Sequence, residues 1–198
     1  MNNAQVEELL YQALETEIGG VQVYRTALRC AVNEDLHKEW EKYLSETESH
    51  VRIVTDVFNE LGLDTEMETP GRTIVRMKGK ALIQAMETAL AEGDPAAAQL
   101  VAAECVVDAE TKDHANWELI GRVAEKADGS KKTVLTEAYG QVEEEEDMHL
   151  YHTMGWAREL WIESLGMPAV LPPPEEERQV VTAIGASRAE QARDEMLK

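Results

Sequence analysis

The amino-acid sequence is dominated by long blocks in which apolar residues recur every three or four positions. This spacing is typical of α-helices with one buried face, and the blocks are too long to be β-strands. Gly62 is suited to end the second block, and Pro95 is suited to the first turn of the fourth. The pattern therefore predicts an all-α protein. The expected helices cover residues ~4–31, ~34–62, ~73–92, ~95–127, ~130–165 and ~175–196.

The order of these helices is long, long, short, long, long, followed by a tail helix. Four long helices with one long connection between the second and the third form a known type of four-helix bundle. The short helix would lie within that crossover connection. At 198 residues the chain suits one sizeable core. We therefore expect a bundle domain over residues 1–171 and a C-terminal helical extension over 172–198.

The chain has a formal net charge of −20. This charge repels nucleic-acid phosphates and anionic membrane surfaces, so we expect neither as a partner. No apolar run approaches the ~18–20 residues of a membrane-spanning helix, and the first ten residues lack the features of a signal peptide. The two cysteines, Cys30 and Cys105, form no paired motif. These features predict a reduced, cytoplasmic protein.

Each of the four long helices carries ionisable residues in the middle of its apolar face. These inward residues are Glu17, His50, Glu110, Glu146 and His149. A buried carboxylate costs roughly several kcal/mol unless it is paired or bound to a cation. Divalent metal ions are the simplest common cause, because they offset several negative charges and also accept imidazole nitrogen.

The spacing of these residues resembles that of the ferritin-like di-metal carboxylate superfamily, in particular rubrerythrins and bacterial stress-induced ferritin-like proteins. That superfamily takes one glutamate from each of two helices and a Glu-x-x-His pair from each of the other two. Glu17 and Glu110 match the single glutamates. Glu146 and His149 match one complete pair. The resemblance covers about residues 4–165 and implies a ferritin-like four-helix bundle.

The match is incomplete on the second long helix, where Thr47 stands in place of the glutamate that should precede His50. Three other residues could complete the set of ligands: Glu46, Asp113 and His114. A site for one metal ion, or for none, is the alternative that Thr47 leaves open. The segment LSETESHVRIVTDVFNELG, which contains Thr47, is nevertheless similar to the second helix of the stress-induced group.

The resemblance implies iron or manganese as the cofactor, with two ions if the site is complete. It also implies oxygen or hydrogen peroxide as the small oxidant, and a di-metal oxidoreductase of peroxidase or ferroxidase type in oxidative stress or metal handling. In that picture His50 and His149 each bind one ion. Glu17 and Glu110 bridge or cap the ions, and Glu146 completes its side.

A metal-free helical stress or interaction protein that keeps the bundle is the alternative hypothesis. The inward polar groups would then form a hydrogen-bonded network, with Glu110 or Glu146 partly protonated. The tail helix after Pro172 could pack on its own bundle or on a second copy of the chain, and we expect a homodimer.

Overall fold

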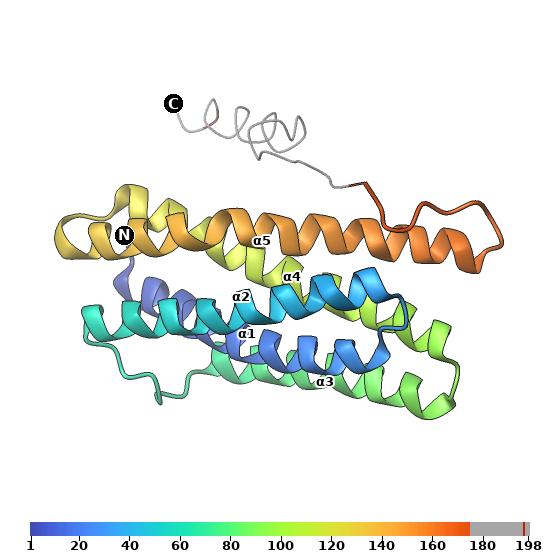
Figure 1. The fold of residues 1–198 in the computed structure, drawn as a ribbon. Helices are drawn as coiled ribbons and strands as arrows, with labels where there is room; N and C mark the ends of the chain where they lie inside the picture. The colour runs from blue at the N-terminus through green and yellow to red at the C-terminus, as the bar shows by residue number, and fades with distance from the viewer. Residues whose placement is uncertain (175–195, 197–198) are drawn as a thin grey trace.

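The computed structural model describes residues 1–174 and Met196, and this part of the chain contains five α-helices and no strand (Figure 1). The helices are α1 (Asn3–Cys30), α2 (Glu34–Leu61), α3 (Pro70–Glu92), α4 (Pro95–Lys126) and α5 (Gly129–Ser164). The prediction of an all-α protein is confirmed. The helix predicted over ~175–196 lies, apart from Met196, outside the described residues, as does most of the predicted extension over 172–198.

The boundaries of four helices fall close to the predicted ones, whereas α3 begins earlier, at Pro70. The hydroxyl oxygen of Thr69 accepts a hydrogen bond from the backbone N–H of Arg72 at 3.1 Å and so caps the helix. Proline suits the next position, because the first helical N–H has no partner within the helix. Gly62 ends α2 with a φ of 68°, as its place in the sequence predicts.

The helices pack as two consecutive pairs, α1 with α2 and α4 with α5 (Figure 1). α1 also contacts α4, and α2 contacts α5, so these four helices contact one another in a closed circuit. α3 lies against α1 and α4, outside that circuit. Within the described part of the chain, no helix has the length and apolar character needed to cross a membrane.

Buried apolar residues form two separate clusters along these four helices. On α1 one cluster ends at Leu14 and the other begins at Val23, and Glu17 lies in the interval between them. The other three helices show the same interruption, at positions that include His50, Glu110 and Glu146. The ionisable residues therefore occupy a common level between two apolar layers.

The helical pattern places the side chain of Glu15 on the outward face of α1, and this prediction is wrong. The structure buries Glu15 beneath α3. Its carboxylate accepts a hydrogen bond from Nε of Arg72 at 2.7 Å and another from Nε of Arg76 at 2.6 Å. Helical periodicity locates the face toward the main core, and it does not show that a further helix covers a second face.

Replacing Glu15 by glutamine is expected to lower the free energy of unfolding by about 3 kcal/mol, because the buried guanidinium of Arg72 loses its counter-charge. Burial by itself would raise the pKa of Glu15, but Arg76 and Arg72 lower it below 4.5. The stabilisation should therefore be present above that pH and be lost as the pH falls. Urea unfolding followed by circular dichroism measures the change. Glu68→Gln, which removes an exposed partner of Arg76, should leave stability nearly unchanged.

Candidate metal centre

Six ionisable side chains meet at the level between the two apolar layers, and none has more than 4% of its surface exposed. They are Glu17 from α1, His50 from α2, Glu110 and Asp113 from α4, and Glu146 and His149 from α5. All five inward residues predicted from the sequence belong to this set. Asp113 joins them, and because it was one of three alternatives at the sequence level, its place is a finding of the structure.

Glu146 lies at the centre of the cluster, between the two imidazoles. Its Oε1 is 3.0 Å from Nδ1 of His50 and 3.5 Å from Nδ1 of His149. Each of these nitrogens also faces a second carboxylate at 3.7 Å, Glu17 for His50 and Glu110 for His149. The two rings are stacked, with centroids 5.6 Å apart. Both Nδ1 atoms therefore point into the same group of carboxylates.

The outer nitrogen of each imidazole is held by a different carboxylate. Nε2 of His50 lies 2.8 Å from Glu145, and Nε2 of His149 lies 3.1 Å from Glu46. A carboxylate accepts a hydrogen bond from Nε2–H, and in the neutral imidazole this leaves Nδ1 with a lone pair directed inward. Histidines that bind metals characteristically donate their other N–H to a carboxylate in this way.

Two overlapping groups of three residues bring their ligand atoms within 4.8 Å of one another. One group is His50, Glu146 and His149, and the other is Glu17, Asp113 and Glu146. Three ligand atoms at such separations can bind a common cation. Because Glu146 belongs to both groups, its two carboxylate oxygens could serve two neighbouring ions.

Several carboxylate oxygens in the cluster make no hydrogen bond to any described residue. They are Glu17 Oε2, Glu110 Oε2, Asp113 Oδ1 and Glu146 Oε2. Buried polar atoms are nearly always hydrogen-bonded, so this number of exceptions in one place calls for a ligand. Oxygens without a donor, gathered around two imidazole nitrogens, fit a divalent cation well.

The acids of the cluster titrate far from their ordinary range. Burial raises the pKa of Glu17 to about 7, and the negative charge of Glu146 adds to the increase. Burial raises the pKa of Glu110 in the same way, again with a contribution from Glu146. For Asp113 burial and the charges of Glu17 and Glu146 raise the pKa well above its usual value. Without a cation, Glu17 therefore still holds a proton in part of the molecules at neutral pH.

The pKa values of the imidazoles and of Glu146 shift against the effect of burial, because these groups pair with one another. Burial alone would lower the pKa of His50, but the carboxylates of Glu146 and Glu17 raise it to about 10. Burial alone would raise the pKa of Glu146, but His149 and His50 lower it to about 2. In the metal-free protein His50 is consequently protonated at neutral pH, and a metal ion that binds its Nδ1 must displace that proton.

The other two alternatives from the sequence lie outside the centre. Glu46 contacts the outer nitrogen of His149 and does not take the place of a glutamate at position 47. His114 is partly exposed and pairs with Asp147 at 3.1 Å. Thr47 is buried beside the cluster, and its hydroxyl donates to the backbone carbonyl of Tyr43 at 2.9 Å.

Two residues around the site, Glu145 and Trp117, were not identified as functional by the helical pattern. Glu145 was overlooked because its side chain lies at the edge of the inward face, where helical position alone does not decide its direction. Trp117 was predicted mainly as a core residue, but its indole N–H donates to Oε1 of Glu17 at 2.7 Å. Tyr24 was predicted as a core residue that could donate a hydrogen bond to a ligand carboxylate. It is fully buried, and burial and the charges of Glu110 and Glu146 raise the pKa of its phenol well above the usual value.

Comparisons with protein-family models, with curated proteins and with solved structures found no match for this chain. The resemblance to ferritin-like proteins therefore stays a prediction. Function has to be inferred from the buried cluster itself.

Proposed function

We propose that this chain is a ferritin-like four-helix bundle that binds two divalent ions of iron or manganese and reacts with oxygen or hydrogen peroxide. The observation that carries the proposal is the orientation of the two imidazoles. Each has its Nε2 held by an outer carboxylate, and both direct Nδ1 toward Glu146. A purely structural network has no need to align two histidines in this way.

The charges of the cluster support two ions. Glu17, Glu110, Asp113 and Glu146 together carry four negative charges when ionised, which equals the charge of two divalent cations. The overlapping groups around Glu146 suggest how the ligands divide, with both histidines on one side and the carboxylates of Glu17 and Asp113 on the other. Asp113 would then supply the carboxylate that Thr47 does not.

Iron or manganese held in such a site would supply redox chemistry toward a small oxidant. The protein's own contribution is orientation and exclusion of water. Trp117 fixes one oxygen of Glu17 through its indole N–H, so that the other oxygen faces the cluster. The buried phenol of Tyr24 stays protonated next to Glu110 and Glu146 and can keep a proton at the site. The apolar layers on either side limit access of bulk water.

Titration of the chelator-treated protein with Mn²⁺ or Fe²⁺ is expected to give two ions per chain, with protons released as the metal binds. Calorimetry in two buffers of different ionisation enthalpy measures both quantities. Anaerobic Fe²⁺-loaded protein should then consume hydrogen peroxide faster than the same amount of free Fe²⁺. Glu110→Ala should lower the stoichiometry and the rate, whereas Glu144→Ala, at an exposed position of α5, should change neither.

The alternative, a metal-free helical stress or interaction protein, makes the opposite predictions. Neither ion would then bind with a defined stoichiometry, and chelation would leave the melting temperature unchanged. Binding of metal without any effect on peroxide consumption would retain the metal centre and remove the proposed redox role.

A further inference from the structure

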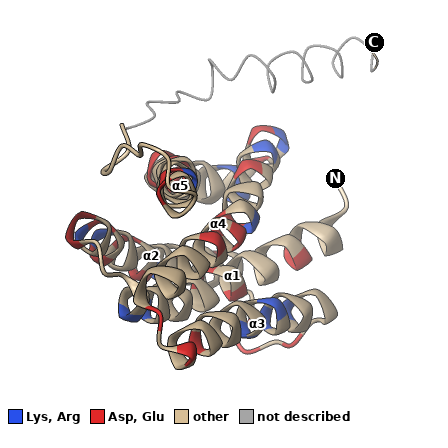
Figure 2. Ribbon diagram, turned by 90° about the vertical axis from the view of Figure 1, so that its right-hand side faces the viewer, with Lys and Arg blue, Asp and Glu red and all other residues tan. Residues whose placement is uncertain are grey.

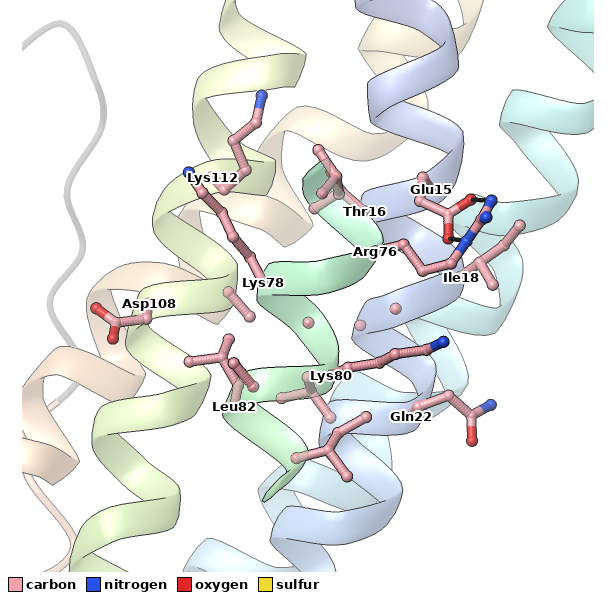
Figure 3. A pocket seen from close by; sticks show the side chains of 18 residues that line it. Glu15, Thr16, Ile18, Gln22, Arg76, Lys78, Lys80, Leu82, Asp108 and Lys112 are labelled. Carbon is pink, nitrogen blue, oxygen red and sulfur yellow. Dashed lines mark hydrogen bonds and ion pairs between the residues drawn. The ribbon is translucent and has the colours of Figure 1, made fainter. Parts of the chain in front are cut away.

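A second candidate site lies in a cavity of about 640 Å³ between α1, α3 and α4 (Figure 3). None of the six residues of the metal centre lines this cavity. Two of their neighbours in the chain do: Thr16, which precedes Glu17, and Lys112, which precedes Asp113. The volume falls in the range of small-molecule pockets, roughly 300–1,000 Å³. The cavity is thus large enough for an organic ligand and separate from the metal ligands.

The walls of the cavity are mainly aliphatic. The apolar side chains that line it include Ile18, Val23, Val75, Leu82, Ile83 and Ala109. Two helical glycines, Gly19 and Gly79, also line it, and a Cβ added at either would meet no atom within 4 Å. Glycine inside a helix is unfavourable by about 1 kcal/mol relative to alanine. These glycines keep space open in the wall at a cost in helix stability.

Four cationic residues line the cavity, against two acidic ones, in a chain whose net charge is −20. Lys78 and Lys80 make no hydrogen bond or ion pair with another described residue, and Lys112 donates to the amide oxygen of Asn116. In Figure 3 Lys78 extends from α3 toward α4, where Lys112 lies. Both lysines line the same cavity, so their positive charges repel each other.

The acids that line the cavity do not neutralise these lysines. Glu15 is already bonded to Arg72 and Arg76, and Figure 3 shows Asp108 pointing away from Lys78. α3 as a whole has four basic and two acidic residues, so it is a cationic element in an acidic chain (Figure 2). An anionic group between Lys78 and Lys112 would relieve their repulsion.

The geometry points to a binding site for an amphipathic anion, an aliphatic carboxylate whose chain lies against the apolar wall and whose head group lies between Lys78 and Lys112. Both halves of the ligand follow from the lining: the aliphatic walls select a hydrocarbon chain, and the lysines select negative charge. The inference does not depend on the proposed metal chemistry, because the cavity and the metal centre share no residue.

Calorimetric titration with decanoate, decanol and decyltrimethylammonium tests the site on the full chain. Decanoate should bind with one molecule per chain, decanol more weakly, and the cationic analogue not measurably. Lys78→Glu should weaken the binding of decanoate by about tenfold or more, because the side chain at this position then repels the carboxylate of the ligand. Gly79→Leu should abolish binding while keeping the fold, since leucine is a better helix former and a Cβ at this position meets no atom within 4 Å.

Matched controls separate the cavity from general effects. Gly140→Leu introduces the same side chain into α5, where an added Cβ also meets no atom within 4 Å, and should leave decanoate binding unchanged. Lys38→Glu makes the same charge reversal on the exposed face of α2 and should also have no effect. Equal binding of the cationic analogue, full binding by Gly79→Leu, or no binding of decanoate up to about 1 mM would each overturn the inference.

Discussion

Replacing Glu146 by glutamine is expected to weaken the binding of both divalent ions by about a hundredfold or more. The reason is its position, because Glu146 belongs to both groups of converging ligand atoms and its Oε1 faces the Nδ1 atoms of His50 and His149. Changes to outer partners of metal ligands already reduce affinity by about 10–100-fold, and the loss of a shared charged ligand should exceed that. Glutamine keeps the shape of the side chain, so the fold should survive.

The comparison with single-group variants makes this prediction specific. Asp113→Asn should weaken mainly one ion and His149→Gln mainly the other, because each belongs to only one of the two groups. Glu144→Gln makes the same chemical change on an exposed position of the same helix and should leave both ions bound. If Glu146→Gln weakens only one ion, or no more than Glu144→Gln does, then Glu146 is not the shared ligand. Calorimetry with Mn²⁺ measures each stoichiometry.

The stability of the protein should depend on pH in opposite directions with and without metal. In the metal-free protein the raised pKa of Glu17, about 7, makes folding less favourable as the pH rises from 4.5 to 7, because the buried carboxylate loses its proton. His50 contributes stability that is complete below its ordinary pKa of 6.5 and is lost as the pH rises through about 10. The metal-free protein therefore loses stability as the pH rises, first through Glu17 between 4.5 and about 7 and then through His50 between 6.5 and about 10, each by roughly a few kcal/mol.

Glu146 acts only at lower pH, because its pKa is lowered from 4.5 to about 2. Its contribution is present above 4.5 and is lost in acid. The metal-free protein should consequently be most stable near pH 4.5, where the contribution of Glu146 is complete and the loss from Glu17 has not yet begun. That optimum is the combined result of one acid held ionised and another held protonated in the same cluster.

Metal ions should oppose the loss of stability that the metal-free protein shows as the pH rises, because they replace the protons that the cluster otherwise holds. At a free metal concentration of 100 Kd the added stability is about 2.7 kcal/mol, and Kd itself decreases as the pH rises. Melting temperatures measured from mildly acidic to mildly alkaline pH, with chelator or with Mn²⁺, test this. The two curves should diverge as the pH increases. Parallel or coincident curves would contradict a cluster in which metal and protons compete.

The helical pattern was sufficient to predict the class of fold and the inward positions of the main ionisable residues. Long helices with one apolar stripe leave little freedom in which face is buried, so Glu17, His50 and Glu110 could be placed from spacing alone. The level at which they lie follows from the interruption of the apolar clusters on all four helices. Their convergence into ligand groups depends on how the helices pack, and only the structure supplies that.

Residues at the edges of the helical faces could not be assigned in the same way. Asp113 and Glu46 both flank an apolar stripe, yet the structure places the first inside the cluster and the second against an outer nitrogen of His149. Glu15 was assigned to the solvent, because nothing in the period of α1 reveals that α3 covers a second face. Small differences in helix rotation and packing decide such positions, and a regular period of 3.6 residues does not contain that information.

The central claim is that the buried acids and imidazoles exist to hold cations. The most direct test is an anomalous-difference map from crystals of the Mn²⁺-reconstituted protein. Two peaks are expected beside Glu146, one adjoining the Nδ1 atoms of the histidines and one adjoining Glu17 and Asp113. Peaks confined to surface carboxylates, with none inside the cluster, would contradict it.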